Sequence, residues 1–128
     1  MTDRRSTGEL EESVLQYLWV VGEPSTPAEV HAAIAPDLAY TTVMTVLSRL
    51  FKKGLLEREK HGRAYAYRPV AGEAIHRAEQ MHEHLGAAGD KHAVLSSFIE
   101  TLSVDEATEL RQLLNLSLIH ISEPTRPY

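Results

Sequence analysis

One short stretch of this sequence brings hydroxyl and cationic side chains together at helical spacing without any acidic residue. When successive residues of segment 40–53 are turned by about 100°, these groups gather on one side of a helix. An ordinary solvated face mixes Glu with Lys, because such pairs four residues apart support the helix. The absence of acids indicates a face that meets a polyanion. Its members are Thr41, Thr45, Ser48, Arg49 and Lys52, with Thr42 and Lys53 at the edge.

The chemistry of this face suits the major groove of DNA. An α-helix fits the groove, an Arg side chain donates two hydrogen bonds to guanine, and Thr offers a hydroxyl or a methyl group. Lys52 and Lys53, near the helix end, suit phosphates, which position a protein without specifying a sequence. The predicted DNA contacts of this segment are Tyr40, Thr41, Thr42, Thr45, Arg49, Lys52 and Lys53.

The opposite side of the same segment is apolar and predicts a buried stripe about 140° wide. Gly54 follows as a natural stop, so we expect the helix to span about residues 40–53. The apolar stripe consists of Val43, Val46, Leu47, Leu50 and Phe51.

A basic hairpin is predicted directly after this helix. Residues 55–60 and 63–69 alternate as strands do, and Gly62 supplies a permissive backbone in the turn between them. The hairpin residues expected to reach an adjacent DNA backbone or minor groove are Lys60, His61 and Arg63.

Charge is divided unevenly along the chain. The net charge is -5 at pH 7, yet residues 40–68 carry +5 and the remainder carries -10. Such asymmetry between segments indicates a functional surface. The acidic remainder also discourages indiscriminate binding to phosphate.

Two shorter helix patterns precede the basic helix. The first covers about residues 9–20 and ends at a segment rich in Gly and Pro. The second begins after Thr26, a capping residue with Glu29 three positions on, and ends before Pro36. The order helix, helix, basic helix, basic hairpin is that of a winged helix-turn-helix.

Helical patterns continue in the C-terminal part, at about residues 73–85, 91–101 and 104–116. Fewer than ~40–60 residues make a marginal core, so the apolar positions of this region need a partner, and a second copy of the chain is the simplest one. We therefore expect a mainly α fold with a small β-hairpin, in which a helical dimerisation tail follows the winged helix. The predicted dimerisation residues are Val94, Leu95, Phe98, Ile99, Leu102, Leu110, Leu113 and Leu114.

The last residues, 117–128, do not continue the helix pattern and look like a translated sequencing-adapter fragment. The sequence thus divides into a disordered leader, a winged-helix DNA-binding domain, a helical dimerisation region and a non-native tail. Their expected bounds are residues 1–7, 8–71, 72–116 and 117–128.

Several classes of protein are disfavoured by composition. The chain has no Cys, so it has no disulfide framework and no Cys-type zinc site, which fits a reducing cytoplasm. It shows no secretion signal, and no apolar run approaches the ~20 residues that span a bilayer. No nucleophile elbow, phosphate loop or paired-carboxylate pattern is evident. We expect a cytoplasmic protein without membrane insertion, enzymatic activity or cofactor.

Histidines in the C-terminal part offer a metal site as one interpretation and a polar, exposed helix as the other. The second is favoured because His82 and His84 point to different sides of a helix, and no His-Glu-x-x-His string is present. We therefore expect no metal site. The histidines concerned are His76, His82, His84 and His92.

Over about residues 8–116, the sequence resembles the BlaI/MecI family of penicillinase repressors. The most specific part is the pattern TTV…LxRLxKKG that ends at Gly54. Further matching segments are residues 10–19, 62–67, 97–100 and 103–111, of which the wing segment 62–67 is a weak match by itself.

The resemblance implies a homodimeric transcriptional repressor that binds a palindromic operator in double-stranded DNA. It also implies control of β-lactam-response genes and inactivation by a membrane sensor protease that cuts an Asn-Phe bond in the dimerisation region. Here Ser97 stands before Phe98 in place of Asn, so these two residues are the candidate cleavage site and depart from the family pattern. Ala39 stands where some members carry a Ser cap, and Asp37 is the alternative cap.

Two other functions remain open on the residues alone. One is a winged-helix regulator of unrelated genes that responds to another signal. The other is a winged-helix module that binds protein and never touches DNA, against which the acid-free helix face argues.

Overall fold

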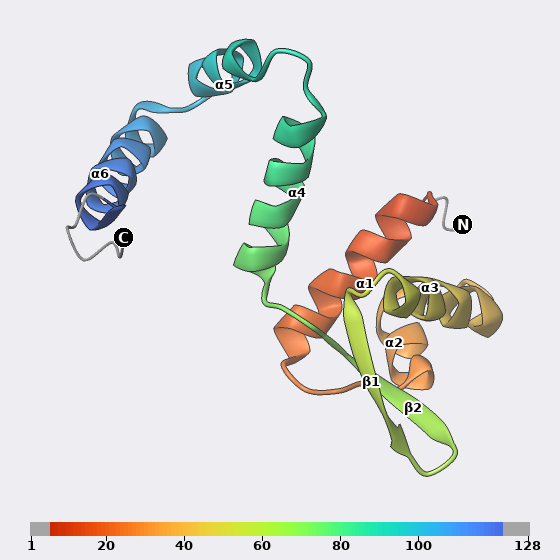
Figure 1. Ribbon diagram of the computed structural model, residues 1–128. Coiled ribbons are helices and arrows are strands. Elements are labelled where there is room, and N and C mark those ends of the chain that lie inside the picture. The colour runs from red at the N-terminus through yellow and green to blue at the C-terminus, as the bar shows by residue number, and fades with distance from the viewer. Residues whose placement is uncertain (1–5, 122–128) are drawn as a thin grey trace. The chain divides into compact units, whose positions relative to one another are not determined.

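The computed structural model of this chain describes residues 6–121, and the side chains of residues 6–116. These residues form helices and one two-stranded antiparallel hairpin (Figure 1). The expected mainly α fold with a small β-hairpin is confirmed. The elements are α1 (Thr7–Val21), α2 (Pro27–Ile34), α3 (Tyr40–Lys52), β1 (Leu56–His61), β2 (Ala64–Pro69), α4 (Glu73–Ala87), α5 (Lys91–Glu100) and α6 (Val104–Ile121).

Capping boxes set the start of the first two helices, because a hydroxyl and a carboxylate there exchange hydrogen bonds with the backbone. Thr26 and Glu29 form the expected box at α2. Ser6 and Glu9 form another at α1. The expectation of a disordered leader over residues 1–7 is therefore wrong at its last two residues, and the others lie outside the described residues.

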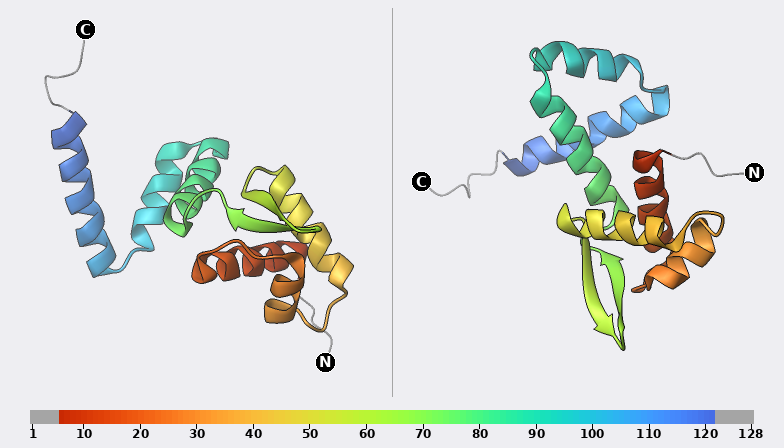
Figure 2. Two further views of the ribbon diagram at one scale, coloured as in Figure 1. Left: turned by 90° about the horizontal axis from the view of Figure 1, so that it is seen from below. Right: turned by 90° about the vertical axis from the view of Figure 1, so that its right-hand side faces the viewer.

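Glycines with positive φ end α3 and turn the hairpin, as expected from the sequence. Gly54 follows the last turn of α3 at φ 83°, and Gly62 stands in the two-residue turn between β1 and β2 at φ 65°. Both values lie in the left-handed region that glycine enters at no steric cost. The hairpin extends beyond the helices, so its turn stands free of them (Figure 1, Figure 2).

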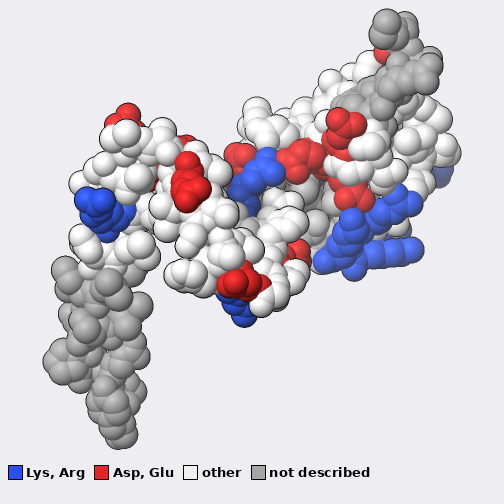
Figure 3. All heavy atoms as spheres, turned by 90° about the horizontal axis from the view of Figure 1, so that it is seen from above, with Lys and Arg blue, Asp and Glu red and all other residues white. Residues whose placement is uncertain are grey.

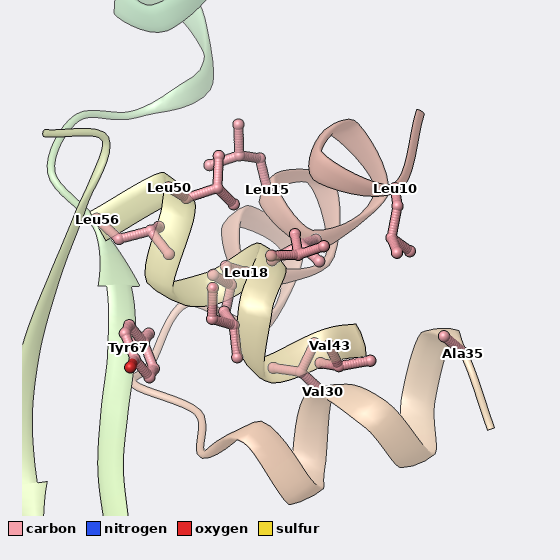
Figure 4. Packing of buried hydrophobic residues seen from close by; sticks show 12 residues of the cluster. Leu10, Leu15, Leu18, Val30, Ala35, Val43, Leu50, Leu56 and Tyr67 are labelled. Carbon is pink, nitrogen blue, oxygen red and sulfur yellow. The ribbon is translucent and has the colours of Figure 1, made fainter. Parts of the chain in front are cut away.

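The core of the N-terminal unit lies between α1, α2, α3 and the base of the hairpin (Figure 4). Ser25 pairs with Tyr67 through two backbone hydrogen bonds, which ties the segment before α2 to β2. The predicted apolar stripe of α3 is confirmed, with Phe51 half-buried at its margin. The core residues are Leu10, Val14, Leu15, Leu18, Val30, Ala35, Val43, Val46, Leu47, Leu50, Leu56 and Tyr67.

The chain divides into two compact units after Glu79, inside α4, whereas the sequence pattern suggested a boundary near residue 72. The first turns of α4 belong to the N-terminal unit because they pack on α1. The ring centroids of Trp19 and His76 are 5.3 Å apart. The indole N–H of Trp19 also donates a hydrogen bond to the Ala71 carbonyl.

The C-terminal unit contains α5 and α6 after the end of α4. Asp90 caps α5, and Ser103 with Glu106 forms the capping box predicted for α6. The backbone of α6 remains helical through Ile121, so the expectation that residues 117–128 leave the helix is wrong for residues 117–121. The rest of that segment lies outside the described residues.

Candidate nucleic-acid interface

The exposed side of α3 carries the hydroxyl and cationic residues that the sequence assigned to DNA. Because the apolar stripe of the same helix is buried in the core, this side points away from the core. The predicted contact residues of α3 that are exposed are Tyr40, Thr41, Thr42, Thr45, Arg49, Lys52 and Lys53.

A shallow groove runs along this side of α3 and includes a residue that the sequence reasoning passed over. Met44 is 45% exposed and lines the groove together with the polar residues. On the helical wheel Met44 lies about 90° from the centre of the buried stripe, at the border of the polar arc, and this position could have indicated its exposure. An apolar side chain there can contact a thymine methyl group. The lining residues are Met44, Thr45, Ser48, Arg49 and Lys52.

The start of α3 is held by α2 rather than by a side-chain cap. Ala39 occupies the N-cap position and no side chain accepts a capping hydrogen bond there, so the expected cap from Asp37 is wrong. The Nε2 atom of His31, in α2, lies 2.6 Å from the carbonyl oxygen of Leu38. The His31 and Tyr40 rings are nearly perpendicular, with their centroids 5.9 Å apart. These contacts position Tyr40 at the first turn of α3.

Lys53, predicted to contact phosphate, forms an ion pair within the protein. Its Nζ atom lies 2.9 Å from Oε1 of Glu11 in α1. The Lys53 side chain is 51% exposed and the Glu11 side chain is 14% exposed, so the pair lies at the surface. The ammonium group of Lys53 therefore ties the end of α3 to α1 and is engaged before any DNA arrives.

The hairpin presents its predicted basic residues at its exposed end. Lys60, His61 and Arg63 are all exposed. The imidazole of His61 lies 3.3 Å from the Glu59 carboxylate, which gives this histidine a local partner. Arg68, on the other strand, pairs with glutamates of β1 at 3.5 and 3.6 Å.

The cations of the N-terminal unit thus fall into two groups, those with a carboxylate partner and those without. On the face shown in Figure 3, the largest group of Lys and Arg side chains has Asp and Glu along its border, and other cations stand apart from it. The paired cations are Lys53, Arg68 and Arg77. Within the described part of the chain, those without a carboxylate partner are Arg49, Lys52, Arg58, Lys60 and Arg63.

A second cluster joins α1 to the start of α4. Arg77 forms ion pairs with Glu12 of α1 and with Glu73, the latter at 3.4 Å, and lies over the Trp19 ring. The hydrogen bond to the Glu12 carboxylate raises the pKa of Arg77 above its usual value. His76 is buried beside Trp19, so the expectation that all the C-terminal histidines are exposed is wrong for this one.

Apolar side chains of α5 and α6 are exposed on the C-terminal unit. Phe98 is 39% exposed and Ile99 is 54% exposed, although both are large and apolar. Ser97 and Phe98, the candidate cleavage site, lie inside α5 rather than in a loop. The predicted dimerisation residues that are exposed are Val94, Leu95, Phe98, Ile99, Leu113 and Leu114, and those half-buried are Leu102 and Leu110.

No group of three metal-ligating side chains gathers within the described part of the chain. None of the described helices has the length and apolar character needed to cross a membrane.

Known proteins resemble this chain over most of its length. It matches the penicillinase repressor family over residues 7–116. It is 44% identical over 112 residues to the transcriptional regulator BlaI of Mycobacterium tuberculosis, covering 84% of this chain and 81% of that protein. It is 35% identical over 77 residues to the penicillinase repressor of Bacillus licheniformis, covering 57% of this chain and 60% of that protein.

Among solved structures, wild-type MarR from E. coli is similar over 86% of this chain and 76% of that chain, with 26% identity and a TM-score of 0.46. The family assignment rests on the sequence match, which spans both the winged helix and the helical tail. The chain belongs to the penicillinase repressor family and is a winged-helix, DNA-binding transcriptional repressor of the BlaI/MecI kind, not an enzyme.

Proposed function

We propose that this repressor binds a palindromic operator as a homodimer, with one α3 helix in the major groove of each half-site. The proposal rests on the exposed side of α3, which carries hydroxyl and cationic side chains and no acid. Two of its cations, Arg49 and Lys52, have no carboxylate partner in the described chain. On this helix Thr41, Thr45 and Arg49 are the proposed base contacts.

Phosphate contacts are proposed for the cations that no carboxylate engages. Lys52 lies in the last turn of α3, and Lys60 and Arg63 lie at the exposed end of the hairpin. These three would meet the backbone on either side of the groove that α3 enters, which sets the register of the protein on the duplex. Lys53 is left out of this set because its ammonium group already pairs with Glu11.

The second copy is proposed to pack against the exposed apolar side chains of α5 and α6. Side chains such as Phe98 and Leu113, exposed by 39% and 54%, would lose this contact with water in a dimer. A two-fold dimer presents two α3 helices related by symmetry, and a palindromic operator has the same symmetry.

Control of β-lactam-response genes in the cytoplasm is proposed from the family, since one relative is named a penicillinase repressor. Inactivation by a sensor protease is proposed at the Ser97–Phe98 bond. That bond lies inside α5, so cutting it requires the helix to open locally first. Dimerisation that buries Phe98 would oppose this opening.

Binding of the purified chain to its own promoter DNA tests the proposal. A gel shift with specific and scrambled duplexes should show specific binding. A dimer with two copies of the phosphate contacts should lose roughly a thousandfold in affinity between about 50 and 200 mM salt. Selection of bound DNA from a random pool should then return two inverted half-sites. Absence of binding to every duplex, at low salt as well, would refute the proposed function.

A further inference from the structure

The side chain of Arg58, on β1, lies between two aromatic rings from different elements. Its guanidinium carbon is 4.0 Å from the centre of the Phe51 ring, in the last turn of α3. It is 4.2 Å from the centre of the Tyr65 ring, on β2. Contacts between a guanidinium and a ring face at this range are attractive, and Arg makes them more often than Lys. One side chain therefore connects the end of α3 to both strands of the hairpin.

A third contact joins Arg58 to the core. Its Nη1 donates a hydrogen bond to the hydroxyl of Tyr67 at 3.5 Å. Tyr67 lies opposite Arg58 in the hairpin register, is only 6% exposed and belongs to the hydrophobic core. The Arg58 guanidinium is thus held by two aromatic rings and one hydroxyl group.

Charge pairing along β1 leaves Arg58 free for this role. Successive side chains of a strand point to opposite faces, so Glu57 and Glu59 lie on the face away from Arg58. Both glutamates pair instead with Arg68 on the neighbouring strand. In the described chain no carboxylate competes with the rings for Arg58.

These contacts of Arg58 support the hairpin, because two strands alone are only marginally stable in water. Its predicted DNA contacts, Lys60 and Arg63, lie at the end remote from the core. If the hairpin were mobile, its ordering on binding to the duplex that Arg49 contacts would cost conformational entropy. A hairpin that is already held against α3 avoids this cost.

We propose that Arg58 is a positioning residue that fixes the wing against the recognition helix α3, so that the wing-tip cations and α3 engage one duplex together. This inference rests on the proposed function. The planar guanidinium is essential to the proposal, because it can stack on both rings at once, whereas a Lys ammonium group is compact and strongly hydrated.

A double-mutant cycle of DNA affinity tests the positioning role. Arg63→Ala should weaken operator binding by about fivefold in the wild-type chain and by less than about twofold in the Arg58→Ala chain, because the wing no longer presents its tip. Arg58→Lys should behave like Arg58→Ala. Arg68→Ala, which removes a cation of the same hairpin that does not stack, is the matched control and should leave the effect of Arg63→Ala unchanged. Equal effects of Arg63→Ala in both backgrounds would mean that Arg58 acts independently of the wing tip and would overturn the proposal.

Hydrogen exchange without DNA separates this proposal from the proposed function. Amides of β1 and β2 should exchange faster in Arg58→Ala than in Arg68→Ala, while amides of α3 stay protected, since only the hairpin is released. Equal protection of the hairpin amides in both variants would refute the claim that Arg58 holds the hairpin against α3, whether or not the protein binds DNA. A wild-type chain that binds no duplex would refute the proposed function, and the exchange result would still decide whether Arg58 holds the wing.

Discussion

Lys53 at the end of α3 and Glu11 in α1 form an ion pair, with the Lys53 Nζ atom 2.9 and 3.2 Å from the two carboxylate oxygens. Its neighbour Lys52 has no carboxylate partner in the described chain and lines the groove of α3. Two adjacent lysines therefore have different surroundings: Lys53 joins two helices, and Lys52 lines the exposed groove.

Replacement of each lysine by alanine should separate these roles. Lys52→Ala should weaken binding to all duplexes by a similar factor and reduce the salt slope by about 2, because each subunit of the proposed dimer loses one phosphate contact. Lys53→Ala should change DNA affinity by less than about twofold and lower the free energy of unfolding by at most about 1 kcal/mol, the usual range of an exposed ion pair. Fluorescence anisotropy over a salt series and urea unfolding measure the two effects. An equal loss of affinity in both variants would show that Lys53 also contacts DNA.

Arg49→Ala should remove a base contact and cost about 1–3 kcal/mol of operator binding, with relaxed preference at one position of each half-site. Arg49→Lys is the control, since it keeps the charge but loses the forked donor geometry. It should recover affinity for non-specific DNA but not the preference. Binding to a panel of single-base operator variants gives the measurement. Unchanged discrimination among those variants in Arg49→Ala would rule out the base-reading role.

Phe98→Asp should break the proposed dimer, because a carboxylate buried in an apolar interface lacks a partner. We expect the dimer dissociation constant to rise by roughly a hundredfold or more, as for a central interface residue. Ser97→Asp adds the same charge one position earlier, about 100° around the helix, and should leave the dimer intact. Sedimentation equilibrium compares the variants. An intact Phe98→Asp dimer would place the interface elsewhere.

A cap added to α3 should stabilise the N-terminal unit. Ala39 has the extended backbone of an N-cap residue, φ -63° and ψ 141°, but no side chain that can accept the orphan N–H groups. Ala39→Ser should raise the free energy of unfolding by about 0.5–2 kcal/mol, and Thr26→Ala should lower it by a similar amount. Urea unfolding with a constant m-value tests both. If Ala39→Ser brings no gain, the first turn of α3 is already satisfied by its contacts with α2.

Much of this fold could be predicted because its signals are local. The capping box at Thr26, the stop at Gly54 and the turn at Gly62 each depend on a few neighbouring residues, and the structure shows all three. The capping box at Ser6 is equally local, but the polar composition of residues 1–7 favoured a disordered segment instead.

Contacts between distant residues were beyond the same reasoning. The sequence shows Arg58 only as one of the positive charges of residues 40–68, although its guanidinium lies close to the rings of Phe51 and Tyr65. His76 was read as an exposed polar residue, although it packs against Trp19 in α1. Neither pairing has a fixed sequence spacing, because each depends on which elements the core brings together.

The sequence by itself determined that α3 has a buried apolar side and an acid-free exposed side, because helical periodicity distributes neighbouring residues around one axis. Only the tertiary structure decided which cations on and around that helix have a carboxylate partner. Lys53 is engaged by a carboxylate 42 residues away, while Lys52 beside it is not. Ion pairing depends on distances of a few ångströms between side chains, and the packing of α1 against α3 sets those distances.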